Sequence, residues 1–237
     1  MKCTLFAGVL LSVFCSIIAP APAYSYDVAP VSGGGKIEGK VVFKGTVPTK
    51  TVLPSKDKEV CGGPRKDPLV VVGSGGEVKD AVVYLKEIAS GKDWGKAKKA
   101  EITNHKCIFE PHVQVMPSGM VDVVNADPVL HNTHGYYGTN TAFNVALPIQ
   151  GGRVTKPLRR PGIVRVDCDA HGWMEGWIYV VDNPYYAITG ADGKFSITDV
   201  PPGTYKLVAV QPFTGPVEVP VTVAEKQSTK LTIELKK

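Results

Sequence analysis

The chain contains the stretch Cys168-Asp-Ala-His171-Gly-Trp-Met174, which places a thiol, an imidazole and a thioether within seven residues. A second imidazole comes earlier, in Asn125-Ala-Asp-Pro-Val-Leu-His131-Asn132. Two His, one Cys and one distant axial Met form the ligand set of a blue copper site. The spacing predicts that Cys168 and His171 leave the end of one strand and turn around the metal, while Met174 reaches the axial position. His131 is expected to arrive from a separate strand.

The segment before these residues carries further motifs, namely a Phe109-Glu-Pro111 start, a turn at Gly119 and the run Asn125-Ala-Asp127. Together with the Cys-x-x-His-x-x-Met pattern, they make residues 99–182 similar to the cupredoxins, and among these to the amicyanin and plastocyanin-like members. The resemblance implies a Greek-key β-sandwich with one type 1 copper ion. By the same resemblance, the metal ligands are His131, Cys168, His171 and Met174.

The cupredoxin resemblance also implies roles for neighbours of the ligands. The backbone N–H of Asn132 is expected to donate to the Cys168 sulfur, and such outer hydrogen bonds tune the reduction potential. His171 is expected near the surface, in an apolar patch beside Trp173, where the electron would pass. His134 departs from the family pattern, and it could compete as a ligand or lie beside the site.

The N-terminal stretch is typical of an export signal. Lys2 supplies the positive start, residues 5–18 form the apolar run, and Ala21-Pro-Ala23 is a small-residue cleavage pattern. We therefore expect residues 1–25 to be a signal peptide and the protein to be periplasmic or otherwise extracytoplasmic. The apolar run is shorter than the roughly 20 residues of a membrane span, so no membrane span is expected.

The cysteine count bears on the same assignment. Cys3 and Cys15 lie in the expected signal peptide, which leaves Cys61, Cys107 and Cys168. In an oxidising compartment two of three cysteines are expected to pair. Cys61 with Cys107 is the natural bridge if Cys168 binds copper. The alternative is that Cys61 or Cys107 is free, because sequence alone does not fix the connectivity.

The charge of the chain is mildly basic. Loss of Lys2 with the signal would lower the formal net charge from +5 to +4, which falls short of a nucleic-acid binder's profile. Basic residues gather just before the Cys168 motif, and they could steer an acidic redox partner or form a solvated strand edge guarded by charge. These residues are Arg153, Lys156, Arg159, Arg160 and Arg165.

The rest of the chain is also β in character. Short runs rich in β-branched and aromatic residues are separated by Gly, Pro, Asn and Asp, as expected of sandwiches or barrels. No long amphipathic helix is evident, and residues 88–100 are expected to form a connecting segment. The predicted strands lie at 41–43, 69–72, 81–85, 164–166, 177–181, 205–210 and 231–235.

A second resemblance lies near the C-terminus. Asp192-Gly193 predicts a tight hairpin turn, Phe195 is expected to point inward, and Pro201-Pro-Gly203 turns the chain into the next strand. The stretch is similar to the carboxypeptidase regulatory-like, transthyretin-type domain. That family's opening strands resemble segments far upstream, in Ile37-Glu-Gly39-Lys-Val41 and Val78-Lys-Asp-Ala81-Val-Val-Tyr84.

The two resemblances predict one small sandwich built from residues 36–98 and 183–237, with the cupredoxin of residues 99–182 inserted between its strands. Close termini make such an insertion easy, and neither outer segment of about 60 residues would bury an ample core alone. The alternative is three consecutive small β units. We expect the outer sandwich to serve attachment or interaction, because it carries no evident chemistry.

Three classes of function follow from these features. The leading prediction is an exported type 1 copper protein that carries one electron at a time and docks transiently with redox protein partners. The alternative is a periplasmic copper carrier, scavenger or sensor without electron transfer. An enzyme is disfavoured, because five histidines, two of them used at the blue site, are too few for a trinuclear copper cluster.

Overall fold

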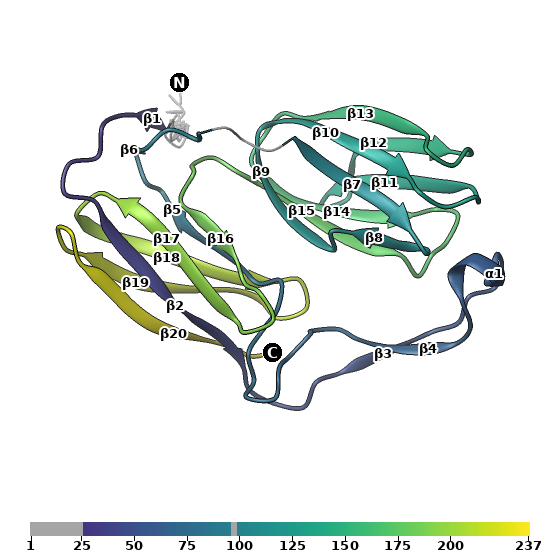
Figure 1. The fold of residues 1–237 in the computed structure, drawn as a ribbon, viewed down its shortest axis with the longest axis horizontal. Coiled ribbons are helices and arrows are strands. Elements are labelled where there is room, and N and C mark those ends of the chain that lie inside the picture. The colour runs from purple at the N-terminus through teal and green to yellow at the C-terminus, as the bar shows by residue number, and fades with distance from the viewer. Residues whose placement is uncertain (1–25, 96–98) are drawn as a thin grey trace, which may run out of the picture.

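A computed structural model describes residues 26–95 and 99–237, so the predicted signal peptide with its two cysteines lies outside the described residues. Figure 1 shows two all-β bodies, as the sequence predicts, and an extended hairpin that reaches from one toward the other. We call the body within residues 100–181 the inner sandwich and the body formed by strands on both sides of it the outer sandwich. The hairpin, residues 49–68, is the arm.

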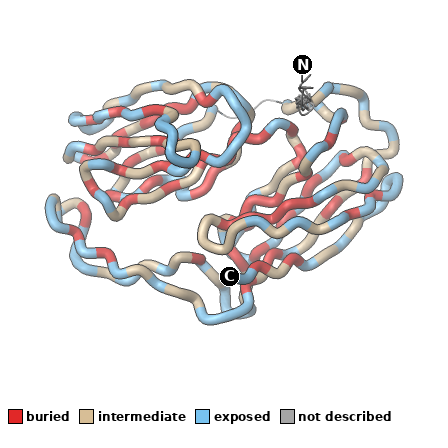
Figure 2. The backbone as a smooth tube through the Cα atoms, turned by 180° about the vertical axis from the view of Figure 1, so that it is seen from behind, coloured by how far each residue is buried: buried red, intermediate tan, exposed pale blue. Residues whose placement is uncertain are grey.

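The inner sandwich has two sheets, with strand orders β13-β10-β7-β8 and β12-β11-β14-β15-β9. Buried and exposed residues alternate along strands such as β14, because one face of the sheet covers the core. The buried apolar side chains of both sheets form one cluster. In Figure 2 the buried residues of this body are red. The strands are β7 (Ala100–His105), β8 (Ile108–Glu110), β9 (Val113–Pro117), β10 (Gly119–Asn125), β11 (His131–Tyr137), β12 (Asn140–Leu147), β13 (Arg153–Leu158), β14 (Gly162–Cys168) and β15 (Glu175–Val181).

The outer sandwich also has two sheets, with strand orders β16-β5-β18-β19 and β17-β2-β20. It has a separate apolar core. Parallel pairing of β2 with β20 joins segments from opposite ends of the described chain. The pairing needs Gly39, because a Cβ there would overlap the carbonyl oxygen of Leu231. The strands are β2 (Gly35–Phe43), β5 (Val82–Lys86), β16 (Tyr186–Ile188), β17 (Lys194–Val200), β18 (Gly203–Gln211), β19 (Gly215–Val223) and β20 (Ser228–Leu235).

The course of the chain explains how the bodies are connected. It forms β2, runs out and back through the arm, returns as β5, passes through the whole inner sandwich and re-enters the outer sandwich at β16. With these pairings as support, we propose the domain division of residues 36–98 with 183–237, and 99–182 inserted. The two bodies meet through a small apolar cluster that contains Val82 and Val210 of the outer sandwich and Val113 and Tyr179 of the inner one.

The arm leaves the outer sandwich as two antiparallel strands, β3 (Thr49–Val52) and β4 (Arg65–Pro68), and its tip carries the short helix α1 (Lys58–Cys61). The first strand of the described chain, β1 (Asp27–Val28), pairs in parallel with β6 (Ser90–Gly91). The strand predicted at 69–72 is wrong. Val70 packs into the outer core, but the backbone of this segment has no neighbouring strand to form a continuous ladder with. It makes one isolated bridge, between Val72 and Val78.

One buried carboxylate ties the inner sandwich together. The Asp122 side chain is 1 % exposed and accepts bonds from Lys99 Nζ at 2.6 Å, Arg153 Nη1 at 2.7 Å and Thr155 Oγ1 at 2.6 Å. The hydrogen bond from Lys99, followed by that from Thr155, holds the pKa of Asp122 well below its ordinary value despite burial. Two of the predicted basic patch residues are thus occupied by ion pairs, since Arg165 also contacts Asp167 at 2.7 Å. Among the described residues, no helix is long and apolar enough to cross a membrane.

Candidate metal centre

The pairing of β11 with β14 brings the first two predicted ligands together. Thr133 lies opposite Cys168 in this antiparallel ladder, so His131 at the start of β11 lies beside the end of β14. Beyond Cys168 the backbone turns twice, with His171 N donating to Cys168 O at 3.2 Å and Met174 N donating to His171 O at 2.9 Å. These turns bring His171 Nδ1 to 3.7 Å from Cys168 Sγ and place Met174 at the end of the same loop.

Three of the four predicted ligands converge on one point. Cys168 Sγ lies 3.7 Å from both His131 Nδ1 and His171 Nδ1, and the two Nδ1 atoms are 3.1 Å apart. All three residues are buried, and each offers one ligand atom to the cluster. Ligand atoms that share one ion at roughly 2.0–2.3 Å lie about 3–4 Å apart. One thiolate and two imidazoles in this arrangement suit copper or zinc, so the residues fit the predicted metal.

Met174 lies at the same place in the core. It is 3 % exposed, belongs to the same apolar cluster as Cys168, and lines one cavity of about 560 Å³ with it. A thioether is a soft ligand that suits copper, and in blue copper sites it is bound weakly and at a long distance. Met174 as axial ligand stays a prediction.

The hydrogen bonds around the cluster hold the thiol and the first histidine. Asn132 N donates to Cys168 Sγ at 3.4 Å, which confirms the contact that the resemblance implied. His131 Nε2 lies 2.9 Å from Asp127 Oδ2, and the same carboxylate accepts the N–H groups of Lys106 at 2.7 Å and Cys107 at 3.0 Å. Because Nε2 faces a carboxylate, its hydrogen is directed away from the cluster and the Nδ1 lone pair toward it.

Burial and these contacts set the protonation of the site. Burial raises the pKa of the Cys168 thiol, and nearby backbone N–H groups, that of Asn132 first, oppose this. Burial lowers the pKa of His131, against the effect of Asp127. Burial also disfavours the ionised form of Asp127, but the N–H groups of Cys107 and its neighbour outweigh it, and the pKa of Asp127 lies below its ordinary value. The first histidine is thereby kept neutral beside a charged carboxylate, as metal ligation requires.

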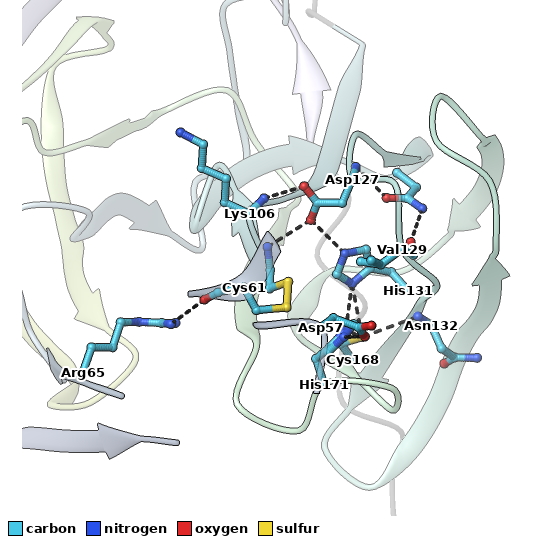
Figure 3. The surroundings of a disulfide bond; sticks show 12 residues. Asp57, Cys61, Arg65, Lys106, Asp127, Val129, His131, Asn132, Cys168 and His171 are labelled. Atoms are coloured by element: carbon cyan, nitrogen blue, oxygen red, sulfur yellow. Dashed lines mark hydrogen bonds and ion pairs between the residues drawn. A yellow bond between two sulfur atoms is a disulfide. The ribbon is translucent and has the colours of Figure 1, made fainter. Parts of the chain in front are cut away.

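The second histidine is covered by the arm, as Figure 3 shows. His171 Nε2 lies 2.8 Å from Asp57 Oδ2, next to α1, and the His171 side chain is fully buried. The expectation that His171 reaches the surface is therefore wrong, because residues far upstream pack over its outer edge. Trp173 lies beside it as expected, with ring centroids 5.1 Å apart, and is partly exposed.

The disulfide between Cys61 and Cys107 is present, which confirms the predicted pairing, and Cys168 is free and buried. The bond joins α1 of the arm to the β7–β8 turn of the inner sandwich. It also adjoins the metal cluster, since the sulfur atoms of both cysteines and a ring nitrogen of His171 lie within 4.8 Å of one another.

None of the three remaining histidines, His105, His112 and His134, belongs to the cluster. His134 Nδ1 lies 3.1 Å from Asp169 Oδ2 and 2.6 Å from the Tyr136 hydroxyl, and its ring stacks on Tyr136. This network occupies both ring nitrogens, since Nε2 contacts Thr141 Oγ1 at 2.9 Å. His112 lines a different cavity, of about 400 Å³, between the arm and the ligand loop.

Two carboxylates that contact the histidines of the cluster, Asp127 and Asp57, were not predicted from the sequence. Asp127 stood within a quoted motif, four residues before His131, and that spacing was a usable signal. Asp57 is 114 residues from His171. The sequence offers one indication that Asp57 lies near the site: it is four residues before Cys61, and the disulfide of Cys61 with Cys107 holds this part of the chain against the inner sandwich.

Comparisons with known proteins gave one family match and several similar solved structures. Residues 178–236 match the family model of the carboxypeptidase regulatory-like domain. A purple cupredoxin from Nitrosopumilus maritimus is 23% identical, with 35% of this chain and 100% of that chain covered and a TM-score of 0.32. Amicyanin from Paracoccus versutus is 15% identical, with 44% and 100% covered and a TM-score of 0.32.

A copper-containing nitrite reductase from Thermus scotoductus is 17% identical, with 60% of this chain and 28% of that chain covered and a TM-score of 0.32. No curated protein sequence matches the chain. The chain thus carries a carboxypeptidase regulatory-like sequence at residues 178–236, as the C-terminal motifs indicated.

Proposed function

We propose that this chain is an exported type 1 copper protein that carries single electrons between redox partners. The observation that carries the proposal is the buried cluster of Cys168 Sγ, His131 Nδ1 and His171 Nδ1, with separations of 3.1–3.7 Å. Met174 is proposed as the weak axial ligand. When bound, one copper ion would supply one-electron exchange between its Cu(I) and Cu(II) forms.

The residues of the chain contribute a fixed ligand geometry. His131 and Cys168 lie on hydrogen-bonded neighbouring strands, and the loop that carries His171 is closed by two backbone turns. The N–H of Asn132 donates to the Cys168 sulfur at 3.4 Å and would help to hold this ligand in place. Because the strand pairing and the two turns fix these groups, little rearrangement should accompany electron exchange, which favours a carrier over a catalyst.

A second candidate is a copper carrier, scavenger or sensor that does not pass electrons. The observation in its favour is the cover over His171, whose outer nitrogen is bonded to Asp57 and whose side chain is buried. A closed site slows the approach of a partner, and slow exchange suits storage or sensing.

The first test is the visible and EPR spectrum of the purified protein after Cu(II) addition and then after ascorbate. We expect an intense thiolate-to-copper band with narrow copper hyperfine splitting that bleaches on reduction. Cys168→Ser should lose the band, and His134→Asn should keep it because His134 lies outside the cluster. A weak tetragonal spectrum would place the second candidate first, and absence of copper binding would remove both.

Electron transfer itself is tested by the rate at which the reduced protein passes its electron to an oxidised redox protein of opposite charge. Rapid, salt-dependent exchange supports the carrier. A blue protein that exchanges its electron only over many minutes would instead act as a copper store or sensor.

A further inference from the structure

The arm joins the outer sandwich to the edge of the metal cluster. Its base is continuous with β2 and the segment before β5, and its two strands pair over residues 49–52 and 65–68. Its tip is held on the inner sandwich by the Cys61–Cys107 disulfide. Arg65 Nη1 donates to the Cys61 carbonyl at 3.3 Å and braces the turn behind α1. The tip therefore has a defined position beside the ligand loop.

Asp57 occupies an unusual backbone position at this tip. It is the N-cap residue of α1, where an aspartate carboxylate ordinarily accepts an N–H of the first helical turn. Here the side chain makes no cap hydrogen bond, and the backbone has φ 51° and ψ 37°, in the left-handed region that few residues other than glycine adopt. The carboxylate instead lies 2.8 Å from His171 Nε2. Because the Asp57 side chain does not cap the helix although its backbone adopts an unfavourable conformation, its role lies outside the helix.

The contact fixes which nitrogen of His171 faces the cluster. A carboxylate accepts, so His171 Nε2 carries the hydrogen and Nδ1 keeps its lone pair. That lone pair lies 3.7 Å from Cys168 Sγ. In the same way, His131 Nε2 lies 2.9 Å from Asp127 Oδ2. Each histidine of the cluster thus has its own carboxylate.

We propose that Asp57 is a positioning residue for the copper ligand His171 and that the arm, latched by the Cys61–Cys107 disulfide, delivers it. This inference rests on the proposed copper site and adds to it a contribution from outside the inner sandwich. The Asp57 carboxylate orients the imidazole and places a negative charge behind it. That charge stabilises the doubly charged copper ion more than the singly charged one.

The test is the reduction potential of the full chain in Asp57→Asn, with Glu59→Gln as the matched control. Asn keeps the shape and an acceptor oxygen but removes the charge. Loss of such an outer partner typically costs 10–100-fold in metal affinity. If the loss falls on Cu(II), the potential rises by roughly 59–118 mV, at about 59 mV per tenfold for one electron. Glu59 is exposed on the same short helix, so its change should leave the potential in place.

A second measurement tests the contact without copper. The ¹⁵N–¹H correlations of the His171 ring in the metal-free wild type should show the hydrogen on Nε2, and Asp57→Ala should lose this preference. The readout does not depend on whether Asp57→Asn binds copper.

The outcomes separate this inference from the proposed function. A raised potential or loss of copper in folded Asp57→Asn, with Glu59→Gln unchanged, supports the positioning role. A blue wild type whose Asp57→Asn and Glu59→Gln variants have equal potentials overturns it and leaves the copper site standing. A wild type without a blue spectrum ends the proposed function. A metal-free His171 with its hydrogen on Nδ1 ends the positioning role.

Discussion

Replacement of both disulfide cysteines, Cys61→Ala with Cys107→Ala, should destabilise the inner sandwich by an amount that the loop length sets. The bond closes a loop with a sequence separation of 46. In the chain-entropy model, a cross-link over about 46 residues removes roughly 13–14 cal/mol/K from the unfolded chain, or about 4 kcal/mol at 25 °C. Measured losses for native disulfides of small domains run at about 2–5 kcal/mol. Alanine avoids leaving an unpaired hydroxyl at two buried positions.

The assay is urea and thermal unfolding followed by tryptophan fluorescence, because Trp173 and Trp177 both lie in the inner sandwich. If the chain unfolds as one unit, about 4 kcal/mol corresponds to a fall in melting temperature of roughly 8–16 °C, and if the inner sandwich unfolds separately the fall is roughly 16–32 °C. The two sandwiches need not unfold together, so circular dichroism should separate the outer transition, which we expect to move less.

Reduction of the wild type with dithiothreitol supplies the matched control. It should shift the inner transition by a similar amount and should leave the double alanine variant where it was. An inner transition that is unmoved in the double variant would refute the reasoning, since it would mean that the cross-link restrains neither the unfolded chain nor the arm.

Three further predictions concern packing, the axial ligand and charge. Gly39→Ala should disrupt the outer sandwich by circular dichroism, because its Cβ would overlap a backbone carbonyl, whereas Gly63→Ala, with nothing within 4 Å of its Cβ, should melt like the wild type. Met174→Leu should keep copper and the blue band but shift the potential in voltammetry; outright loss of copper would mean that Met174 does more than a weak axial ligand does. The pKa of Asp122 in the folded protein lies below its value in the unfolded chain, so the ionised carboxylate stabilises the fold above roughly pH 4 and this stabilisation is lost as the pH falls further. The urea midpoints of Asp122→Asn and wild type should therefore differ most near neutral pH and converge in acid.

Much of the metal cluster could be predicted because its residues are neighbours in sequence. Cys168, His171 and Met174 span one strand end and one loop, so short-range geometry alone brings them together. His131 needed the pairing of β11 with β14, which the family resemblance supplied. The apolar run at 69–72 misled the strand prediction, because β-branched and apolar residues also occur in segments that have no ladder partner, and only Val70 of this run is buried.

The exposure of His171 could not be predicted, because it depends on a partner 114 residues away. The resemblance described only residues 99–182, and the carboxylate that contacts the outer nitrogen of the ring, Asp57, lies outside that span. What covers the ring comes from the arm, a pair of strands with no counterpart in either family motif. The disulfide prediction already contained the answer, since joining Cys61 to Cys107 must bring the residues just before Cys61 to the ligand loop.

The outer sandwich therefore contributes more than an attachment module to the proposed copper site. The inner sandwich has its own core and its own carboxylate for His131, so it can position three of the predicted ligands unaided. The arm supplies the two partners that the inner sandwich lacks. Cys61 is the disulfide partner of Cys107, and Asp57, four residues earlier, contacts His171. The arm is anchored at its base in the outer sandwich and at its tip by a covalent bond, and the two bodies also share an apolar contact. The arm thus connects the outer body, through the segment that ends at the disulfide, to the carboxylate that contacts the imidazole of a proposed metal ligand.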